Sequence, residues 1–215
     1  SLLGQTMKSG IEFIFVNDAT QDDSMEVLRQ VLRRHPERAG QVRILEHDRN
    51  KGLPAARNTG MDTASGEYIY HCDSDDFLEK SMLLKMHTRA QHDNADIVWC
   101  DWYLSFRKKE RYMRQPQFQT PFSALRAMLD GSMKYNVWNK LVRRNLYEST
   151  GIRFPEGHSM GEDMTMIKLM ACSFKESHVP EALYHYVKSD VAMSTGTLSR
   201  KALEDLKFNA EDTIA

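Results

Sequence analysis

The sequence predicts an α/β fold built on a mostly parallel sheet with helices on both faces. In the first half, short apolar runs rich in β-branched and aromatic residues alternate with segments of helical periodicity, which is typical of strand–helix–strand units. Polar and acidic residues directly follow several of these runs, for example after residues 11–16, "IEFIFV". Because ligands bind beyond the carboxyl ends of the strands in such sheets, we expect the functional residues there.

The regular alternation covers the first hundred residues. Nearly continuous apolar runs, which indicate strands buried on both faces, occur at residues 11–16, 42–45, 68–72 and 97–100. Helices are predicted between the cap residues 22–24 and Pro36, at residues 53–63 with Pro54 in the first turn, and at residues 81–92.

The pattern changes after Asp101, and the second half is less regular. It predicts an amphipathic hairpin or loop at 103–118, helices at 121–129 and 164–171, strands at 137–142 and 182–187, and a helix from Ser199. Without a repeat or linker, residues 1–215 are expected to form one domain with two halves, 1–101 and 102–215. Residues 1–6 resemble a helix end with no strand before it, so we expect the first strand of the sheet to lie outside this sequence.

Composition argues against several classes of function. The 215-residue chain has 29 Lys and Arg against 30 Asp and Glu, so its net charge of −1 gives no overall field for nucleic acid, and any anion site must be local. Three cysteines match neither a disulfide framework nor a zinc site, which favours reduced thiols in a cytoplasmic protein. No apolar run approaches the roughly 20 residues that span a bilayer. Any peripheral association with the inner face of a membrane is therefore expected through parts outside this chain.

Three carboxylates stand close together in "HCDSDDFLEK", directly after a predicted strand: Asp73, Asp75 and Asp76. Like charges at this spacing repel unless a cation lies between them, and carboxylate oxygens are ligands that Mg²⁺ or Mn²⁺ accepts. The alternative is that these residues cap the following helix, because Asp and Ser are favoured at N-caps. Taken alone, so short a pattern favours capping.

Two further groups of residues lie where a phosphate or a nucleotide could bind. "NKGLPAARNTG" places Arg57 and Asn58 in the early turns of a predicted helix, whose free N–H groups favour an anion by about 0.3–1 kcal/mol. Asn17 and Asp18 follow a predicted strand, where Asp18 could accept hydrogen bonds from a base or a ribose. Each group has a simpler alternative: a solvated arginine on an ordinary helix, and a turn at the strand end.

The second half offers an acid pair, Glu162 and Asp163, just before an apolar helix. One of them could be a general base on a hydroxyl, a role typically worth about 10²–10⁴ in rate, or both could simply stabilise the first helical turn. Trp138 could be a platform for a sugar ring, although core packing is more usual, and Lys140 could pair with a diphosphate or an acid. The eight histidines show no spacing typical of a zinc site.

Five motifs occur in an order that resembles the family 2 glycosyltransferases of the GT-A fold. They are "IEFIFVNDATQDDS", "NKGLPAARNTG", "GEYIYHCDSDDFL", "VWNKLVRR" and "GED", and the resemblance extends from residue 1 to about 198. It implies a GT-A-type nucleotide-binding sheet and a nucleoside-diphosphate sugar donor, expected to be UDP-linked. It also implies an Mn²⁺ or Mg²⁺ cofactor and a glycan or lipid-linked acceptor in surface polysaccharide synthesis.

The motifs and the resemblance together assign roles to individual residues. Nucleotide-sugar contacts are expected from Asn17, Asp18, Arg57, Asn58, Asp73, Trp138 and Lys140. Metal ligands are expected at Asp73, Asp75 and Asp76. Of the pair Glu162 and Asp163, the second corresponds to the family's usual catalytic base, which implies a single displacement with inversion. The family's late basic loop corresponds to residues 188–199, where the match is weak.

Two other functions remain open at this point. A metal-dependent nucleotidyltransferase or pyrophosphatase also holds a nucleotide with acids and a metal, but we expect it to carry an early basic Gly-rich loop that this sequence lacks. A non-catalytic sugar-nucleotide-binding module would leave the second acid pair without a purpose.

Overall fold

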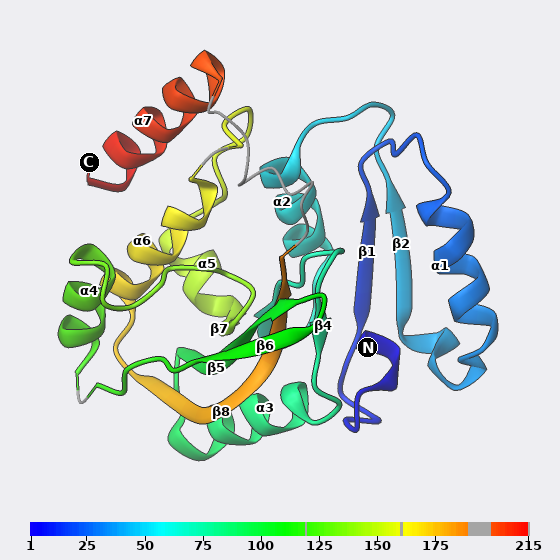
Figure 1. The fold of residues 1–215 in the computed structure, drawn as a ribbon, viewed down its shortest axis with the longest axis horizontal. Helices are drawn as coiled ribbons and strands as arrows, with labels where there is room; N and C mark the ends of the chain where they lie inside the picture. The colour runs from blue at the N-terminus through cyan, green and yellow to red at the C-terminus, as the bar shows by residue number, and fades with distance from the viewer. Residues whose placement is uncertain (119, 160, 189–198, 215) are drawn as a thin grey trace.

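The computed structural model describes residues 1–118, 120–159, 161–188 and 199–214, and its layers are drawn in Figure 1. The helices are α1 (Ser24–Arg33), α2 (Leu53–Thr63), α3 (Met82–Asp93), α4 (Pro121–Leu129), α5 (Arg144–Thr150), α6 (Thr165–Cys172) and α7 (Arg200–Ile214). Short 3₁₀ helices are η1 (Leu2–Gly4), η2 (Pro36–Gln41) and η3 (Glu162–Met164). The strands are β1 (Phe13–Asn17), β2 (Val42–Glu46), β3 (Tyr68–Tyr70), β4 (Phe77–Leu78), β5 (Ile97–Phe106), β6 (Lys109–Met113), β7 (Lys140–Arg143) and β8 (Glu176–Val187).

The strands form two sheets in the part of the chain that the structure describes. β1 and β2 pair in parallel, and a six-stranded sheet has the order β3-β7-β5-β8-β4, with β6 paired to β5. In the larger sheet β5 and β8 are parallel, whereas the pairs β3–β7, β5–β7, β4–β8 and β5–β6 are antiparallel. The expectation of a mostly parallel sheet is therefore wrong. A parallel pair needs a long crossover, and after β5 the chain turns back at once into the β5–β6 hairpin.

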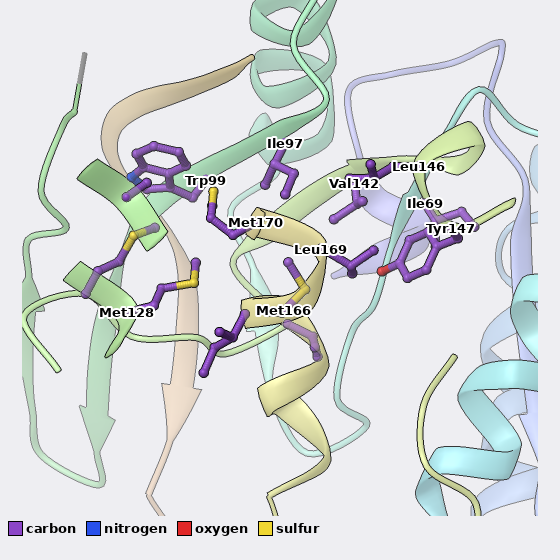
Figure 2. Packing of buried hydrophobic residues seen from close by; sticks show 14 of the residues in the cluster. Ile69, Ile97, Trp99, Met128, Val142, Leu146, Tyr147, Met166, Leu169 and Met170 are labelled. Atoms are coloured by element: carbon purple, nitrogen blue, oxygen red, sulfur yellow. The ribbon is translucent and has the colours of Figure 1, made fainter. Parts of the chain in front are cut away.

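Apolar cores on both faces of the larger sheet confirm the expected covering by helices. Alternate residues of β5 point to opposite faces, so Ile97 and Trp99 join one cluster while Val98 and Cys100 join the other. Figure 2 shows the first cluster, in which Met166, Leu169 and Met170 of α6 lie between Trp99 on one side and Tyr147 on the other. The second cluster packs against α3, on the opposite face of the sheet in Figure 1. The continuous apolar character of β5 in the sequence follows from burial on both faces.

Several predicted elements have the expected bounds, and others differ. The helices at 53–63 and 121–129 are confirmed as α2 and α4. β8 begins at Glu176 rather than Ala182, and α5 was not expected. Most of the late loop expected at residues 188–199 lies outside the described residues. No helix in the described ranges is long and apolar enough to cross a bilayer.

Candidate active site

The guanidinium of Arg57 is the centre of an acidic cluster contributed by separate segments of the chain. Its Nη1 donates to Asp163 Oδ1 at 2.8 Å and to Glu162 Oε1 at 3.4 Å, and its Nη2 donates to Asp73 Oδ1 at 3.2 Å. The arginine side chain is 6% exposed, and the three acids are also largely buried. The structure thus brings together four residues that were predicted from three different motifs.

Local sequence explains how each element places its residue. Arg57 lies in the second turn of α2, whose start is set by Gly52 at a φ of +89° and by Pro54 in the first turn. Asp73 follows the end of β3. Glu162 and Asp163 open η3, which begins after Gly161 in the left-handed conformation. The N-terminal part of α2, the end of β3 and the start of η3 therefore meet at one point.

Burial and mutual proximity change the proton affinities of the cluster. Burial opposes charge on Arg57, yet Asp163, Asp73 and Glu162 together hold its pKa above the usual value. Burial and the neighbouring Asp163 raise the pKa of Glu162 to about 7. Burial also raises the pKa of Asp73, although Arg57 opposes that shift. One guanidinium therefore does not balance three acids, and the cluster keeps a negative character that favours a further cation.

Asn17 ends β1 and Asp18 follows it, and their side chains bond two different parts of the chain. Asn17 Oδ1 accepts a hydrogen bond from the backbone N–H of Thr20 at 2.9 Å. Asp18 accepts from the backbone N–H groups of Lys51 and Gly52, both at 2.8 Å, and its Oδ1 lies 2.6 Å from His47 Nδ1. The turn-forming alternative therefore describes Asn17 in this structure, whereas Asp18 holds the chain immediately before α2. Their contact with a nucleotide stays a prediction.

Asn58 braces a neighbouring backbone segment. Its Nδ2 donates to the carbonyl oxygen of Phe154 at 2.9 Å and to Glu156 Oε1 at 3.1 Å, and its Oδ1 accepts from the N–H of Phe154 at 3.0 Å. The ring of Phe154 in turn lies 5.2 Å from the Arg57 guanidinium, within range of a cation–π interaction. These bonds use both ends of the amide, so Asn58 holds the backbone at Phe154 beside the cluster, and its contact with a nucleotide stays a prediction.

Trp138 and Lys140 lie in the interior, which corrects two expected roles. Trp138 is 3% exposed and stacks on Tyr184 and Tyr186, so no free ring face is left for a sugar. Lys140 is 1% exposed, and its ammonium donates to the carbonyl oxygens of Lys134 and Asn136 and to Asn139 Oδ1. Burial lowers the pKa of Lys140 to about 7, and the negative charge of Asp163 opposes that shift. A diphosphate cannot reach this ammonium in the structure.

The acids after β3 differ in their ability to hold a metal ion. Asp76 uses both oxygens, because Tyr184 Oη donates to one at 2.6 Å and the N–H of Val187 to the other at 2.7 Å. Asp73 contacts Arg57 through Oδ1, and Asp75 is exposed. No group of three or more possible metal ligands forms within the described ranges. Carboxylates are ligands that a hard divalent cation accepts together with phosphate oxygens, so Asp73 and Asp75 stay the predicted ligands. Asp76 is the weaker candidate, because both its oxygens already accept a hydrogen bond.

Sequence reasoning missed two residues beside the cluster. His71 contacts Tyr147 and Phe154 edge-on, at ring-centroid distances of 6.4 and 5.1 Å. Burial and the charge of Arg57 lower the pKa of His71 to about 3, so the ring is neutral. Neither His71 Nε2 nor Tyr147 Oη has a hydrogen-bond partner among the described residues. His71 directly precedes the acidic motif, which was a local signal for it, whereas nothing near Tyr147 in the sequence indicated its position.

Comparison with known proteins identifies the family. The profile described as "Glycosyl transferase family 2" matches residues 1–162, most of the sequence. The chain belongs to glycosyl transferase family 2. The resemblance inferred from the five motifs is therefore confirmed.

Relatives and solved structures agree with this membership. The chain is 33% identical over 171 residues to the uncharacterized glycosyltransferase EpsJ of Bacillus subtilis, a match that covers 76% of this chain and 48% of the relative. It is 27% identical over 186 residues to the succinoglycan biosynthesis protein ExoO of Rhizobium meliloti, covering 82% and 52%. The chain thus spans about half the length of these relatives.

A solved structure supports the fold of the chain. The complex of S. aureus TarS (residues 1–349) with UDP-GlcNAc has a TM-score of 0.75 and 18% identity, covering 98% of this chain and 60% of that chain. The α/β class and the GT-A fold are therefore confirmed.

Proposed function

We propose that this chain carries the donor-binding and catalytic centre of an inverting, metal-dependent glycosyltransferase. It moves a sugar from a nucleoside diphosphate, expected to be UDP, to a hydroxyl of a glycan or lipid-linked acceptor in surface polysaccharide synthesis. Family membership supports the reaction class, the UDP-GlcNAc complex of TarS supports the donor, and the name of the relative ExoO supports the pathway.

The observation that carries this proposal is the meeting of Asp73 with Glu162 and Asp163 at Arg57. Asp73 belongs to the acids that suit a metal and a diphosphate, and the other two belong to an acid pair that suits a hydroxyl. A sugar transferred from a diphosphate to an acceptor must lie between two such groups. A module that only bound a sugar nucleotide would not need the second pair at this position.

The donor side of the centre is built to hold negative charge. Asp73 and Asp75 would hold Mn²⁺ or Mg²⁺, which supplies positive charge to the phosphates while the sugar–phosphate bond breaks. The free N–H groups at the start of α2 lie in the same region and favour the same charge. Arg57 lies between the donor acids and the acceptor acids, so a bound diphosphate would compete with the carboxylates for its guanidinium.

The acceptor side supplies the base. Asp163 bonds Arg57 through Oδ1, which leaves its other oxygen for a hydroxyl. In the reaction this carboxylate takes the hydroxyl proton, and the acceptor oxygen forms a bond to the anomeric carbon. The bond from that carbon to the β-phosphate oxygen breaks on the opposite face, and the nucleoside diphosphate leaves with the electron pair. Glu162, with a pKa of about 7, shares the negative charge of the pair.

A donor panel tests the proposal. The full-length protein is incubated with Mn²⁺, UDP-, GDP- and TDP-sugars, and glycan or lipid-linked acceptors, and the released nucleotides are separated. Transfer predicts release of the diphosphate together with a glycosylated acceptor of inverted anomeric configuration. Release of a monophosphate would instead indicate a pyrophosphatase, and binding without turnover would indicate a binding module.

A variant tests the role of the base. Asp163→Asn is expected to lower the transfer rate by about 10²–10⁴ while donor binding is retained. Asp62→Asn is a matched control, because Asp62 is exposed and pairs with Arg153 on the surface. Near wild-type transfer by a folded Asp163→Asn protein would refute the assignment.

A further inference from the structure

Helix α7 packs one side against the segment that leads into Glu162 and Asp163, which it contacts at residues 157–159 and 161. It begins at Arg200, beyond residues 1–162 matched by the family profile, so the family assignment gives it no role. In Figure 1 it lies beside α6, at the end that carries η3. The side chains that make the contact are one and two turns apart along the helix: Lys201, Asp205, Leu206, Phe208 and Asn209.

Asp205 is the polar centre of this contact. It is 4% exposed, and its Oδ1 lies 3.1 Å from His158 Nδ1 while its Oδ2 accepts from the backbone N–H of Ser159 at 3.3 Å. Lys201 donates to Asp205 Oδ1 at 2.6 Å and to the carbonyl oxygen of Gly157 at 3.1 Å. One buried carboxylate and its lysine therefore fix three consecutive residues, 157–159, through backbone and side-chain bonds.

Apolar contacts hold the same segment in place. The rings of His158 and Phe208 stack at a centroid distance of 3.7 Å and an interplanar angle of 9°. A Cβ atom on Gly161 would lie only 3.0 Å from Leu206 Cδ1, so the backbone just before Glu162 lies directly against α7. A side chain at position 161 would disturb this approach, and the left-handed φ of +84° also favours glycine there.

The other side of the segment faces the start of α2. A Cβ atom on Gly52 would lie 3.6 Å from Ser159 Oγ, and Gly52 is the residue that precedes α2. Arg57 of the same helix holds Glu162 and Asp163 by ion pairs. The acid pair is therefore fixed from one side by Arg57, and the chain leading to it is fixed from the other side by Asp205.

We propose that Asp205 is a positioning residue, which holds the segment before Glu162 and Asp163 between α7 and the start of α2. It does not touch the substrate. Its bonds to His158, Ser159 and Lys201 set where the acid pair stands relative to the donor side. The catalytic part of this inference rests on the proposed function, because the acid pair acts on the acceptor hydroxyl only in that reaction.

The expected size of the effect follows from geometry. Reacting groups must be held within a narrow range of positions, and a displacement of about 1 Å can reduce the rate about 10²-fold. Loss of Asp205 leaves Arg57 in place, so the donor side and its binding should change little. The predicted signature is therefore a fall in kcat of about 10- to 100-fold with a donor KM within about threefold of wild type.

The experiment compares three variants of the full-length protein. Asp205→Ala removes every bond of the carboxylate, whereas Asp205→Asn keeps an oxygen that can accept from the N–H of Ser159. Asp212→Asn is the matched control, because Asp212 joins α7 to Lys168 of α6 at 2.7 Å without contacting the segment. We expect kcat to be highest in the control Asp212→Asn, intermediate in Asp205→Asn, which is partly rescued, and lowest in Asp205→Ala.

Hydrogen exchange gives a readout that does not depend on activity. Peptides that cover residues 155–164 should exchange at least several-fold faster in Asp205→Ala than in wild type, and at the wild-type rate in Asp212→Asn. If Asp205→Ala does not fold, Asp205→Asn is measured in its place. The inference would be overturned if exchange in Asp205→Ala were unchanged, if Asp212→Asn showed equal effects, or if the kcat of Asp205→Ala were within twofold of wild type. If the wild-type protein transfers no sugar, the proposed function fails, while the exchange result still decides whether Asp205 holds the segment.

Discussion

Replacement of Arg57 by methionine tests the electrostatic account of the acid cluster directly. The change removes the guanidinium that contacts Asp73, Glu162 and Asp163 but keeps an apolar chain against Phe154. Removal of one partner from a buried ion pair destabilises a protein by about 3–5 kcal/mol, because the remaining charge is buried without compensation. Here the acids keep some contact with water, so we expect about 2–4 kcal/mol near pH 8.

The loss of stability in Arg57→Met should depend on pH. Its direction follows from the raised pKa values of Glu162 and Asp73. The pKa of Glu162 is about 7 in the folded protein, against 4.5 for an unperturbed glutamate, and that of Asp73 is also raised. Between these two values the folded state binds more protons than the unfolded state, so stability falls as pH rises. Without Arg57 both pKa values should rise further. The deficit of Arg57→Met should therefore be small near pH 5 and largest near pH 8.

Thermal and denaturant unfolding at pH 5 and pH 8 measure this effect. For a chain of this length each kcal/mol corresponds to a Tm change of about 2–4 °C, so a decrease of roughly 5–15 °C is expected at pH 8. Arg143→Met is the control, because Arg143 also pairs with two acids, Glu67 and Asp96, and lies over a tyrosine ring, but Glu67 is half exposed. A deficit for Arg57→Met that is no larger than the control, or that is equal at both pH values, would refute the reasoning.

Three substitutions separate the roles of other predicted site residues. Trp138→Ala should lower the free energy of unfolding by about 3–5 kcal/mol with little change in donor affinity, because the ring packs in the core; a stable variant that selectively loses donor binding would contradict this. Asp75→Ala should raise the Mn²⁺ concentration needed for transfer without changing Tm. Asp76→Ala should destabilise by about 1–3 kcal/mol, since it leaves Tyr184 Oη and the Val187 N–H unpaired, while the Mn²⁺ requirement stays that of wild type. Identical titrations for the two aspartate variants would show that their roles are not separate.

Local signals predicted the helices other than α5, because the causes of these helices are local. α2 starts at the Gly52–Pro54 turn, and α4 starts after Thr120, whose side chain accepts from the N–H of Ser123. The strand directions were predicted less well. The apolar run at 97–100 indicated a strand buried on both faces, but nothing in it indicates whether its neighbours run parallel or antiparallel.

In the candidate site, too, local signals predicted some features and not others. Residue type marked the acids and Arg57 as candidates, because few other groups hold a cation or a diphosphate. Residue type could not distinguish Asp75, which is exposed, from Asp76, whose oxygens bind Tyr184 and Val187 more than 100 residues away. It also placed Trp138 among the candidates, although its ring is covered by partners from β8.

The sequence by itself determined the family, the α/β class and the acidic motifs, because these depend on short patterns of residues and their order. The tertiary structure decided which acids lie together. Asp73, Glu162 and Asp163 share one guanidinium although Arg57 is 16 residues from the first and more than 100 from the others. Such a meeting depends on how α2, β3 and η3 pack, and the packing free energy is spread over the apolar core rather than encoded in any one motif. For the same reason, only the packing of α7 brings Asp205 against the segment before the acid pair.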